Sequence, residues 1–295
     1  FRVRAHNEHP DPGDWGGWSR GEYPSGPPMQ PAAPSMERID TPAGGQVQAT
    51  WTAPDDNGDS IDAYYVTLYR NGAEQTTVQV DGGTLTHLFR VENGFDYSVS
   101  VVAENRSGRS DASPQSSAVR SFGQPGQVTG VSGAPTGQSG QVQITYGTPS
   151  DNGQAIDRFE YRLSPGGSGN LGASPAPING LTNGQSYTIQ VRACNTYCGD
   201  WSASSAAFSP YGAPATPPSS GNISSSQGNG ENGRTVSFSW SYPASSNGAA
   251  ISAAQIQVDG GGSQNRDRTG TVSVTGGWEE NHSFRMRVQN EHGQW

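Results

Sequence analysis

The sequence predicts an all-β protein made of consecutive two-layer sandwiches. Three observations predict this fold class: short segments that alternate apolar and polar residues, blocks of about 95 residues that repeat, and abundant turn residues. The chain has 295 residues, of which 41 are glycine and 21 proline, while only 31% are hydrophobic. Such a composition favours many turns and small cores, and no sustained helical periodicity is present.

The first repeated element is an alternating strand with a central aromatic residue and a terminal proline. Its copies occupy residues 47–54, 142–149 and 236–243. Each copy is followed by Asn-Gly and an isoleucine, and the isoleucines lie 95 residues apart, at Ile61, Ile156 and Ile251. We expect the aromatic residues to fill the space between two sheets. They are Trp51, Tyr146 and Trp240.

The second repeated element is an alternating strand that ends in asparagine. Its copies occupy residues 1–7, 97–105, 187–195 and 284–290. A period of two places one face of the strand in a core and the other in water. Short strands of this kind, separated by Gly, Pro and Asn-Gly turns, are typical of a β-sandwich.

Together these motifs resemble the fibronectin type III domain, an immunoglobulin-like sandwich. The resemblance implies that Tyr97 and Tyr187 are corner tyrosines, whose rings are buried and whose hydroxyls bond to nearby backbone. The third copy departs from the pattern, because His282 stands at the corner position. The Asp-Asn-Gly loops look most like bacterial extracellular members of the family.

The repeat spacing predicts four segments. They are a partial module at 1–28 with only strands F and G, two whole modules at 29–122 and 123–211, and a module at 212–295 that lacks strand G. The linkers between them are short and contain proline, which makes them semi-rigid spacers. We therefore expect an extended rod, cut out of a longer protein.

Charge and composition disfavour several functions. The net charge is −9 and no basic stripe is present, which argues against nucleic-acid binding. No apolar run reaches the roughly 18–20 residues that span a membrane, so we expect no membrane insertion within this segment. All 17 basic residues are arginine, which excludes lysine-dependent chemistry. The usual catalytic and phosphate-binding motifs are missing, and we predict neither enzymatic activity nor a cofactor.

The two cysteines, Cys194 and Cys198, lie at the end of a strand and in the following loop. We expect a small structural disulfide that shapes this loop in an oxidising compartment. The alternative is a thiol or metal pair, although two cysteines cannot complete a zinc site. We predict no metal site.

Four tryptophans follow the asparagines that end the second motif: Trp15, Trp18, Trp201 and Trp295. They could stack on sugars, or each could pack on its own F–G hairpin or on the adjoining module. The loop at residues 55–59 resembles part of a calcium loop, but Val66 stands where an EF-hand needs glutamate. A turn is the preferred interpretation, with weak calcium binding as the alternative.

These observations favour a structural role. We predict a repeat segment of a secreted or surface-attached bacterial protein, acting as a spacer, adhesin stalk or filament subunit. The alternative is a set of spacer or carbohydrate-contacting modules beside a secreted polysaccharide-degrading enzyme. The expected partners are neighbouring modules, other copies of the chain in a filament, or cell-surface glycans, and the expected location is extracellular or at the cell surface.

Overall fold

A computed structural model describes residues 1–6, 8, 13–19, 21, 24–217, 234–276 and 281–295. In these ranges all regular secondary structure is β-strand, which confirms the predicted all-β class. No helix in the described ranges is long and apolar enough to cross a membrane. The chain divides into two compact units, residues 1–123 with 152–154 and residues 124–151 with 155–295. We call residues 29–122, 123–211 and 212–295 the first, second and third modules.

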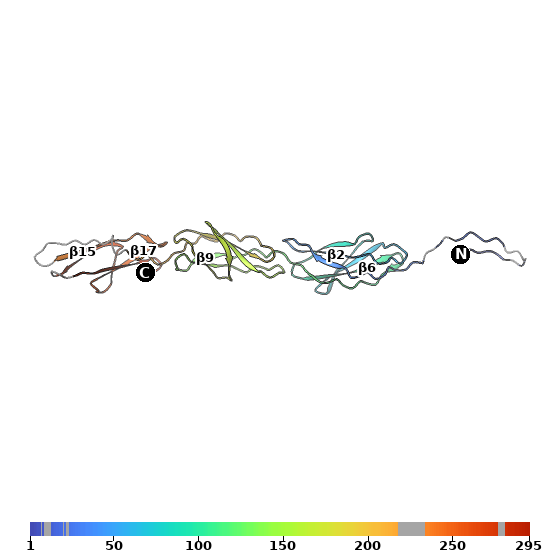
Figure 1. Ribbon diagram of the computed structural model, residues 1–295, viewed down its shortest axis with the longest axis horizontal. Helices are drawn as coiled ribbons and strands as arrows, with labels where there is room; N and C mark the ends of the chain where they lie inside the picture. The colour runs from blue at the N-terminus through green and yellow to red at the C-terminus, as the bar shows by residue number, and fades with distance from the viewer. Residues whose placement is uncertain (7, 9–12, 20, 22–23, 218–233, 277–280) are drawn as a thin grey trace. The chain divides into compact units, whose positions relative to one another are not determined.

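The first module contains two antiparallel sheets, with β2 in one and β6 in the other (Figure 1). One sheet has the order β1 (Ser35–Arg38), β2 (Gln46–Thr50), β5 (Thr86–Arg90). The other joins β4 (Ala73–Asp81), β3 (Ala63–Arg70), β6 (Asp96–Asn105) and β7 (Gly108–Arg109), and β8 (Val119–Arg120) also pairs with β6. The inward rows of both sheets meet in one core, where Trp51 lies edge-on to Tyr64 at 5.6 Å between ring centroids.

The second module repeats this arrangement with its own core. One sheet has the order β13 (Ala176–Ile178), β10 (Val142–Thr145), β9 (Ser132–Pro135). The other has the order β12 (Ser168–Leu171), β11 (Arg158–Ser164), β14 (Thr188–Cys194). Ile144 of β10 and Val191 of β14 are fully buried in this core, as their period-two alternation predicts.

The third module is the least complete in the described ranges. β15 (Arg234–Ser241) pairs with β19 (Thr269–Gly276). A second sheet contains β16 (Ser245–Ser246), β17 (Ala249–Val258), β18 (Gln264–Arg266) and β20 (Phe284–Asn290), with β20 paired to β17. Trp240 is buried, and its ring stacks on Phe284 at 5.7 Å. At the corner position, His282 Nδ1 lies 2.8 Å from an oxygen of Asp259.

The expectation of a regular strand at residues 1–7 is wrong for the described residues, since none of them is assigned to a strand. Instead the carbonyls of Phe1, Val3 and Ala5 accept N–H groups from a second segment. The donors are Ser19, Gly16 and Gly13, at 2.9, 2.9 and 3.1 Å. Successive hydrogen bonds are two residues apart in the first segment but three residues apart in the second, so a regular β-ladder cannot form.

Each predicted whole or nearly whole module therefore contains a separate hydrophobic cluster. The predicted module boundaries and the extended rod stay predictions. The predicted core aromatics Trp51, Tyr146 and Trp240 are 3%, 5% and 4% exposed.

Candidate functional site

The segment that follows β6 in the first module, and the one that follows β14 in the second, pair with the preceding strand in an unusual register. In the first module, Ser110, Ser113 and Ser116 donate their N–H groups to carbonyls of β6 that are two residues apart, each at 2.9 Å. In the second module, Gly199, Ser202 and Ser205 do the same along β14. We call these two segments the G segments. In each, three residues of the segment stand opposite two residues of the strand between successive hydrogen bonds, like a β-bulge that is repeated.

Serine side chains satisfy the strand donors that this register leaves without a carbonyl. The N–H groups of Val99, Val101 and Ala103 donate to serine Oγ atoms at 3.1, 2.9 and 3.0 Å. Ser202 and Ser205 accept from the corresponding N–H groups of β14 at 3.0 and 3.1 Å. Because buried N–H groups must be paired, these serines replace the missing backbone acceptors.

The tryptophans singled out in the sequence all follow the second motif, and Trp201 lies in the G segment of the second module. Trp15, Trp201 and Trp295 each stand two residues after a glycine, in the pattern Gly-x-Trp. Each lies against arginine side chains. The guanidinium-to-ring distances are 4.7 Å for Arg2 and Arg4 on Trp15, 4.8 Å for Arg2 on Trp18, 4.6 and 4.5 Å for Arg162 and Arg192 on Trp201, and 4.5 Å for Arg287 on Trp295.

This geometry bears on the two interpretations of the tryptophans, stacking on sugars and packing within the protein. Cation–π contacts of this kind favour packing of each ring on its own hairpin. Trp15, Trp18 and Trp295 nevertheless remain 46%, 73% and 41% exposed, so their surfaces stay accessible to a ligand. The arginine partners were not predicted from the sequence. Four of the five, Arg2, Arg4, Arg192 and Arg287, lie in the second motif that precedes the tryptophan, and their positions there were the available signal.

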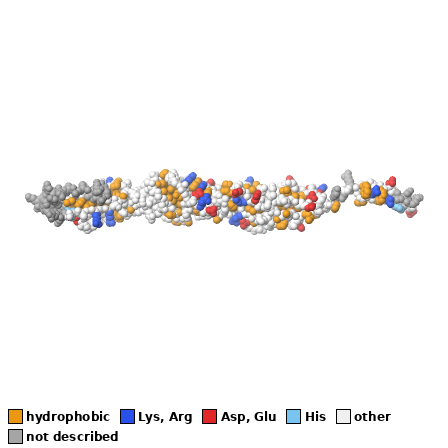
Figure 2. All heavy atoms as spheres, viewed as in Figure 1, with side chains coloured by type: hydrophobic (Ala, Val, Ile, Leu, Met, Phe, Trp, Pro, Cys, Tyr) orange, Lys and Arg blue, Asp and Glu red, His pale blue; other side chains and the backbone are white. Residues whose placement is uncertain are grey.

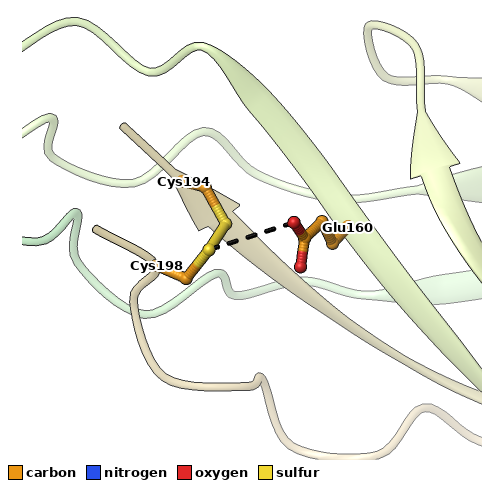
Figure 3. Close-up of side chains that lie close together, drawn as sticks. All are labelled: Glu160, Cys194 and Cys198. Carbon is orange, nitrogen blue, oxygen red and sulfur yellow. Dashed lines mark hydrogen bonds between the residues drawn. A yellow bond between two sulfur atoms is a disulfide. The ribbon is translucent and has the colours of Figure 1, made fainter. Parts of the chain in front are cut away.

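The sulfurs of Cys194 and Cys198 are bonded in the structure (Figure 3). Cys194 is fully buried, while Cys198 is partly exposed. Arg158 reaches the Cys198 Sγ at 3.4 Å, and a carboxylate oxygen of Glu160 lies 3.9 Å from it. The bond ties the end of β14 to the loop that follows, which is the shaping role expected for this pair.

Glu160 is the acidic centre of this corner. Its carboxylate accepts from Arg192 at 2.9 and 2.7 Å and from Arg158 at 2.8 Å. These hydrogen bonds, first from Arg192 and then from Arg158, hold the pKa of Glu160 below its ordinary value. Among the described residues, Glu160, Cys194 and Cys198 form the one group of potential metal ligands. Since metals bind thiolates, sulfurs joined to each other do not supply such ligands.

The three Asn-Gly loops share one conformation. Asn57, Asn152 and Asn247 have φ of 53°, 52° and 52°, and the glycine after each also has a positive φ. The asparagine carbonyl accepts an N–H from a linker glycine every time: from Gly26 at 3.1 Å, Gly123 at 3.0 Å and Gly212 at 3.1 Å. We call each loop with its linker glycine an Asn-Gly joint.

Two of the joints include a second Asn-Gly pair, which lies just before β6 in one case and just before β14 in the other. Asn93 Nδ2 donates to Asn152 Oδ1 at 3.3 Å, and Asn183 Nδ2 donates to Asn247 Oδ1. A Cβ on Gly153 would lie 2.5 Å from the backbone N of Gly94, and one on Gly248 equally close to that of Gly184. The backbones approach so closely that only glycine fits.

In the first and third modules, the asparagine that ends the second motif closes the joint from inside the module. Asn105 and Asn290 are 3% and 0% exposed. Their Nδ2 atoms donate to the carbonyls of Gly26 and Gly212 at 2.8 and 3.1 Å. Their Oδ1 atoms accept N–H groups of the following loop. The repetition of this asparagine was evident in the sequence, but its role was not.

The acidic residues of the first Asn-Gly loop make the contacts of a turn. Asp55 and Asp56 accept the N–H groups of Asn57 and Gly58 at 2.8 and 3.0 Å. Asp59 forms an ion pair with Arg106 at 2.8 Å. These contacts favour the interpretation as a turn over that as a calcium loop.

The corner tyrosines are buried, with Tyr97 3% and Tyr187 8% exposed. The Tyr97 hydroxyl donates to the carbonyl of Glu92 at 3.1 Å, and the Tyr187 hydroxyl accepts the N–H of Thr182 at 3.0 Å. Each partner lies five residues upstream. This is the tyrosine corner of an immunoglobulin-like sandwich.

Comparison with known families agrees with this geometry. The model named "Fibronectin type III domain" matches residues 32–119. Residues 32–119 are a fibronectin type III domain. The second and third modules repeat elements of its strand arrangement. Among solved structures, the crystal structure of chicken CNTN1 FN1-FN3 domains is similar over 90% of each chain, with 16% identity and a TM-score of 0.37. No curated protein matches the chain.

The described surface of the chain carries charges of both signs and open grooves. On the face seen in Figure 2, acidic and basic side chains lie interspersed among uncharged ones. Two open grooves lie on the described surface: about 490 Å³ beside Tyr161 and Gln185 in the second module, and about 290 Å³ beside Gln255 and Arg285 in the third.

Proposed function

We propose that this segment is a non-enzymatic spacer of a secreted or surface-attached bacterial protein, such as an adhesin stalk or a filament subunit. Tandem fibronectin type III modules fit a structural repeat role, because each folds around its own core. The disulfide is in keeping with an oxidising, extracellular location. The observation that carries the proposal is the Asn-Gly joint, which recurs at three linkers.

The joints would limit bending between modules. A linker that is bonded only to water samples many orientations, whereas each joint fixes a linker glycine by hydrogen bonds to a loop asparagine. Near the third joint, Tyr211 at the end of the second module also stacks on His292 of the third at 3.7 Å between ring centroids. Gln294 of the third module donates to the carbonyl of Gly137 in the second at 2.7 Å. Both contacts lie within the second unit.

The test replaces the joint asparagine in Asn247→Ala. We expect a broader distribution of particle dimensions in small-angle scattering, because the linker loses the side-chain bond to Ala213 at 2.8 Å. Asn71→Ala is the matched control, since Asn71 has a similar φ of 50° and precedes a glycine but lies in a hairpin turn. Equal scattering from wild type and both variants would contradict a role of the joint in stiffness.

The alternative role, as carbohydrate-contacting modules beside a polysaccharide-degrading enzyme, is favoured by one feature. This feature is the groove of the third module, which carries arginines without described acidic partners. The neighbouring domains of the full gene distinguish the roles: a catalytic domain beside this segment favours the alternative, and further repeats with an anchor favour the spacer.

A further inference from the structure

The groove of the third module lies on the outer surface of the β17–β20 pair. Its polar lining residues are Gln255, Gln257, Ser263, Arg285 and Arg287. Gln257 pairs in register with Arg285, and Gln255 with Arg287. Because alternate residues of a strand leave the same face, these four side chains project together. At about 290 Å³, the groove is near the lower end of the size of small-ligand sites, roughly 300–1,000 Å³.

The two arginines carry positive charge without a described carboxylate to neutralise it. Arg287 donates twice to the neutral amide oxygen of Gln255, at 2.8 and 2.6 Å. Arg285 is exposed and forms no ion pair among the described residues. The equivalent position to Arg287 in the second module differs, because Arg192 is bonded to Glu160. Among its described residues, the third module thus has an arginine pair without an acidic partner, in a chain of net charge −9.

The groove is also held in shape. Trp295 lies over the Arg287 guanidinium at 4.5 Å and, with Gln255, fixes its plane. Gln257 is fixed by donating to the carbonyl of Gly261 at 2.7 Å. A planar guanidinium binds a carboxylate through two parallel hydrogen bonds. Arg285 is the free member that can make such a contact, with Arg287 about 6.6 Å further along the strand.

We propose that this groove binds a carboxylate-bearing polysaccharide. The acidic groups of such a chain would pair with Arg285 and Arg287, and its hydroxyls would bond to the glutamines and Ser263. A sugar chain fits better than an acidic peptide, because five of the seven lining residues are polar, and Gln255, Gln257 and Ser263 supply hydrogen-bonding groups for hydroxyls. The two apolar lining residues are Ile256 and Met286. This inference does not depend on the spacer role, which concerns the linkers.

The experiment titrates the full chain with an oligogalacturonate, by calorimetry or by NMR. The matched ligand control is the same oligosaccharide fully methyl-esterified, which keeps the rings and removes the charge. We expect saturable binding of the acidic form only, weakened at higher salt because exposed charges are screened. Arg285→Gln should reduce affinity about tenfold or more, the effect expected from losing a hydrogen bond between charged groups.

Arg192→Gln is the matched protein control, because it removes an arginine at the equivalent strand position that Glu160 already neutralises. It should leave binding unchanged. The proposal is overturned by no saturable binding up to about millimolar ligand, by equal binding of the esterified form, or by undiminished affinity of Arg285→Gln. It is likewise overturned if a glutamate oligopeptide of equal charge binds more tightly, which would identify an acidic-peptide surface.

Discussion

At the scale of single residues, the most consequential side chains are small polar ones at buried positions. Ser113 is 6% exposed, and its Oγ accepts the N–H of Val101 at 2.9 Å and donates to the carbonyl of Pro114 at 2.9 Å. It therefore bonds β6 to a G segment that does not pair with this strand in a regular register. The fold depends on such serines because backbone carbonyls cannot reach every strand donor.

Ser113→Ala should lower the free energy of unfolding by about 1–3 kcal/mol, the cost of a buried donor left without an acceptor. Urea denaturation of the full chain, followed at the first module, measures the change. Ser117→Ala is the control, because Ser117 is exposed and only its backbone carbonyl accepts a bond from Ser116. Similar stability of the two variants would show that the serine bridge contributes nothing.

Glu160 makes the stability of the second module depend on pH. Arginine neighbours lower its pKa in the folded chain relative to the ordinary 4.5. Its contribution is therefore fully present above the unfolded pKa and is lost as pH falls through the folded one. As the pH is lowered below about 4.5, the midpoint temperature of thermal unfolding of this module should fall less steeply in Glu160→Gln than in wild type. Identical pH profiles would rule out this role.

At the scale of strands, the sequence located the second motif closely in all three modules, because its apolar residues alternate. β20 matches the expected 284–290 segment, and β6 and β14 lie within a residue or so of theirs. The G segments could not be predicted in this way. Their hydrogen bonds recur every third residue rather than every second, so apolar and polar residues do not alternate along them. The three-residue spacing of Ser110, Ser113 and Ser116 was the only local signal of their register.

Tight approach between strand and G segment gives a second test at this scale. A Cβ on Gly133 of β9 would lie 2.4 Å from the ring of Phe208, which is 6% exposed. Gly133→Ala should destabilise the second module by about 1–3 kcal/mol through overpacking. Gly172→Ala, where a Cβ meets nothing within 4 Å, should have little effect. Chemical denaturation of both variants decides whether the contact is as tight as described.

At the scale of the whole molecule, the account predicts modules that are stable separately and are connected through the Asn-Gly joints. Some of the candidate sites could be predicted from the sequence and others could not. The cysteines, core aromatics and tryptophans were recognisable by residue type, whereas Arg285 and Gln257 meet only through the β17–β20 pairing. Pairing across nearly thirty residues cannot be read from a local pattern.

Native-state hydrogen exchange of Trp51→Ala in the full chain tests the separate cores most directly. Losing this buried ring should cost about 3–5 kcal/mol and reduce amide protection in β3 and β6 of the first module. Because local stability follows the cooperative unit that opens, β10 and β14 of the second module should keep their wild-type protection. A comparable loss of protection in β10 and β14 would mean one shared core and would contradict the account.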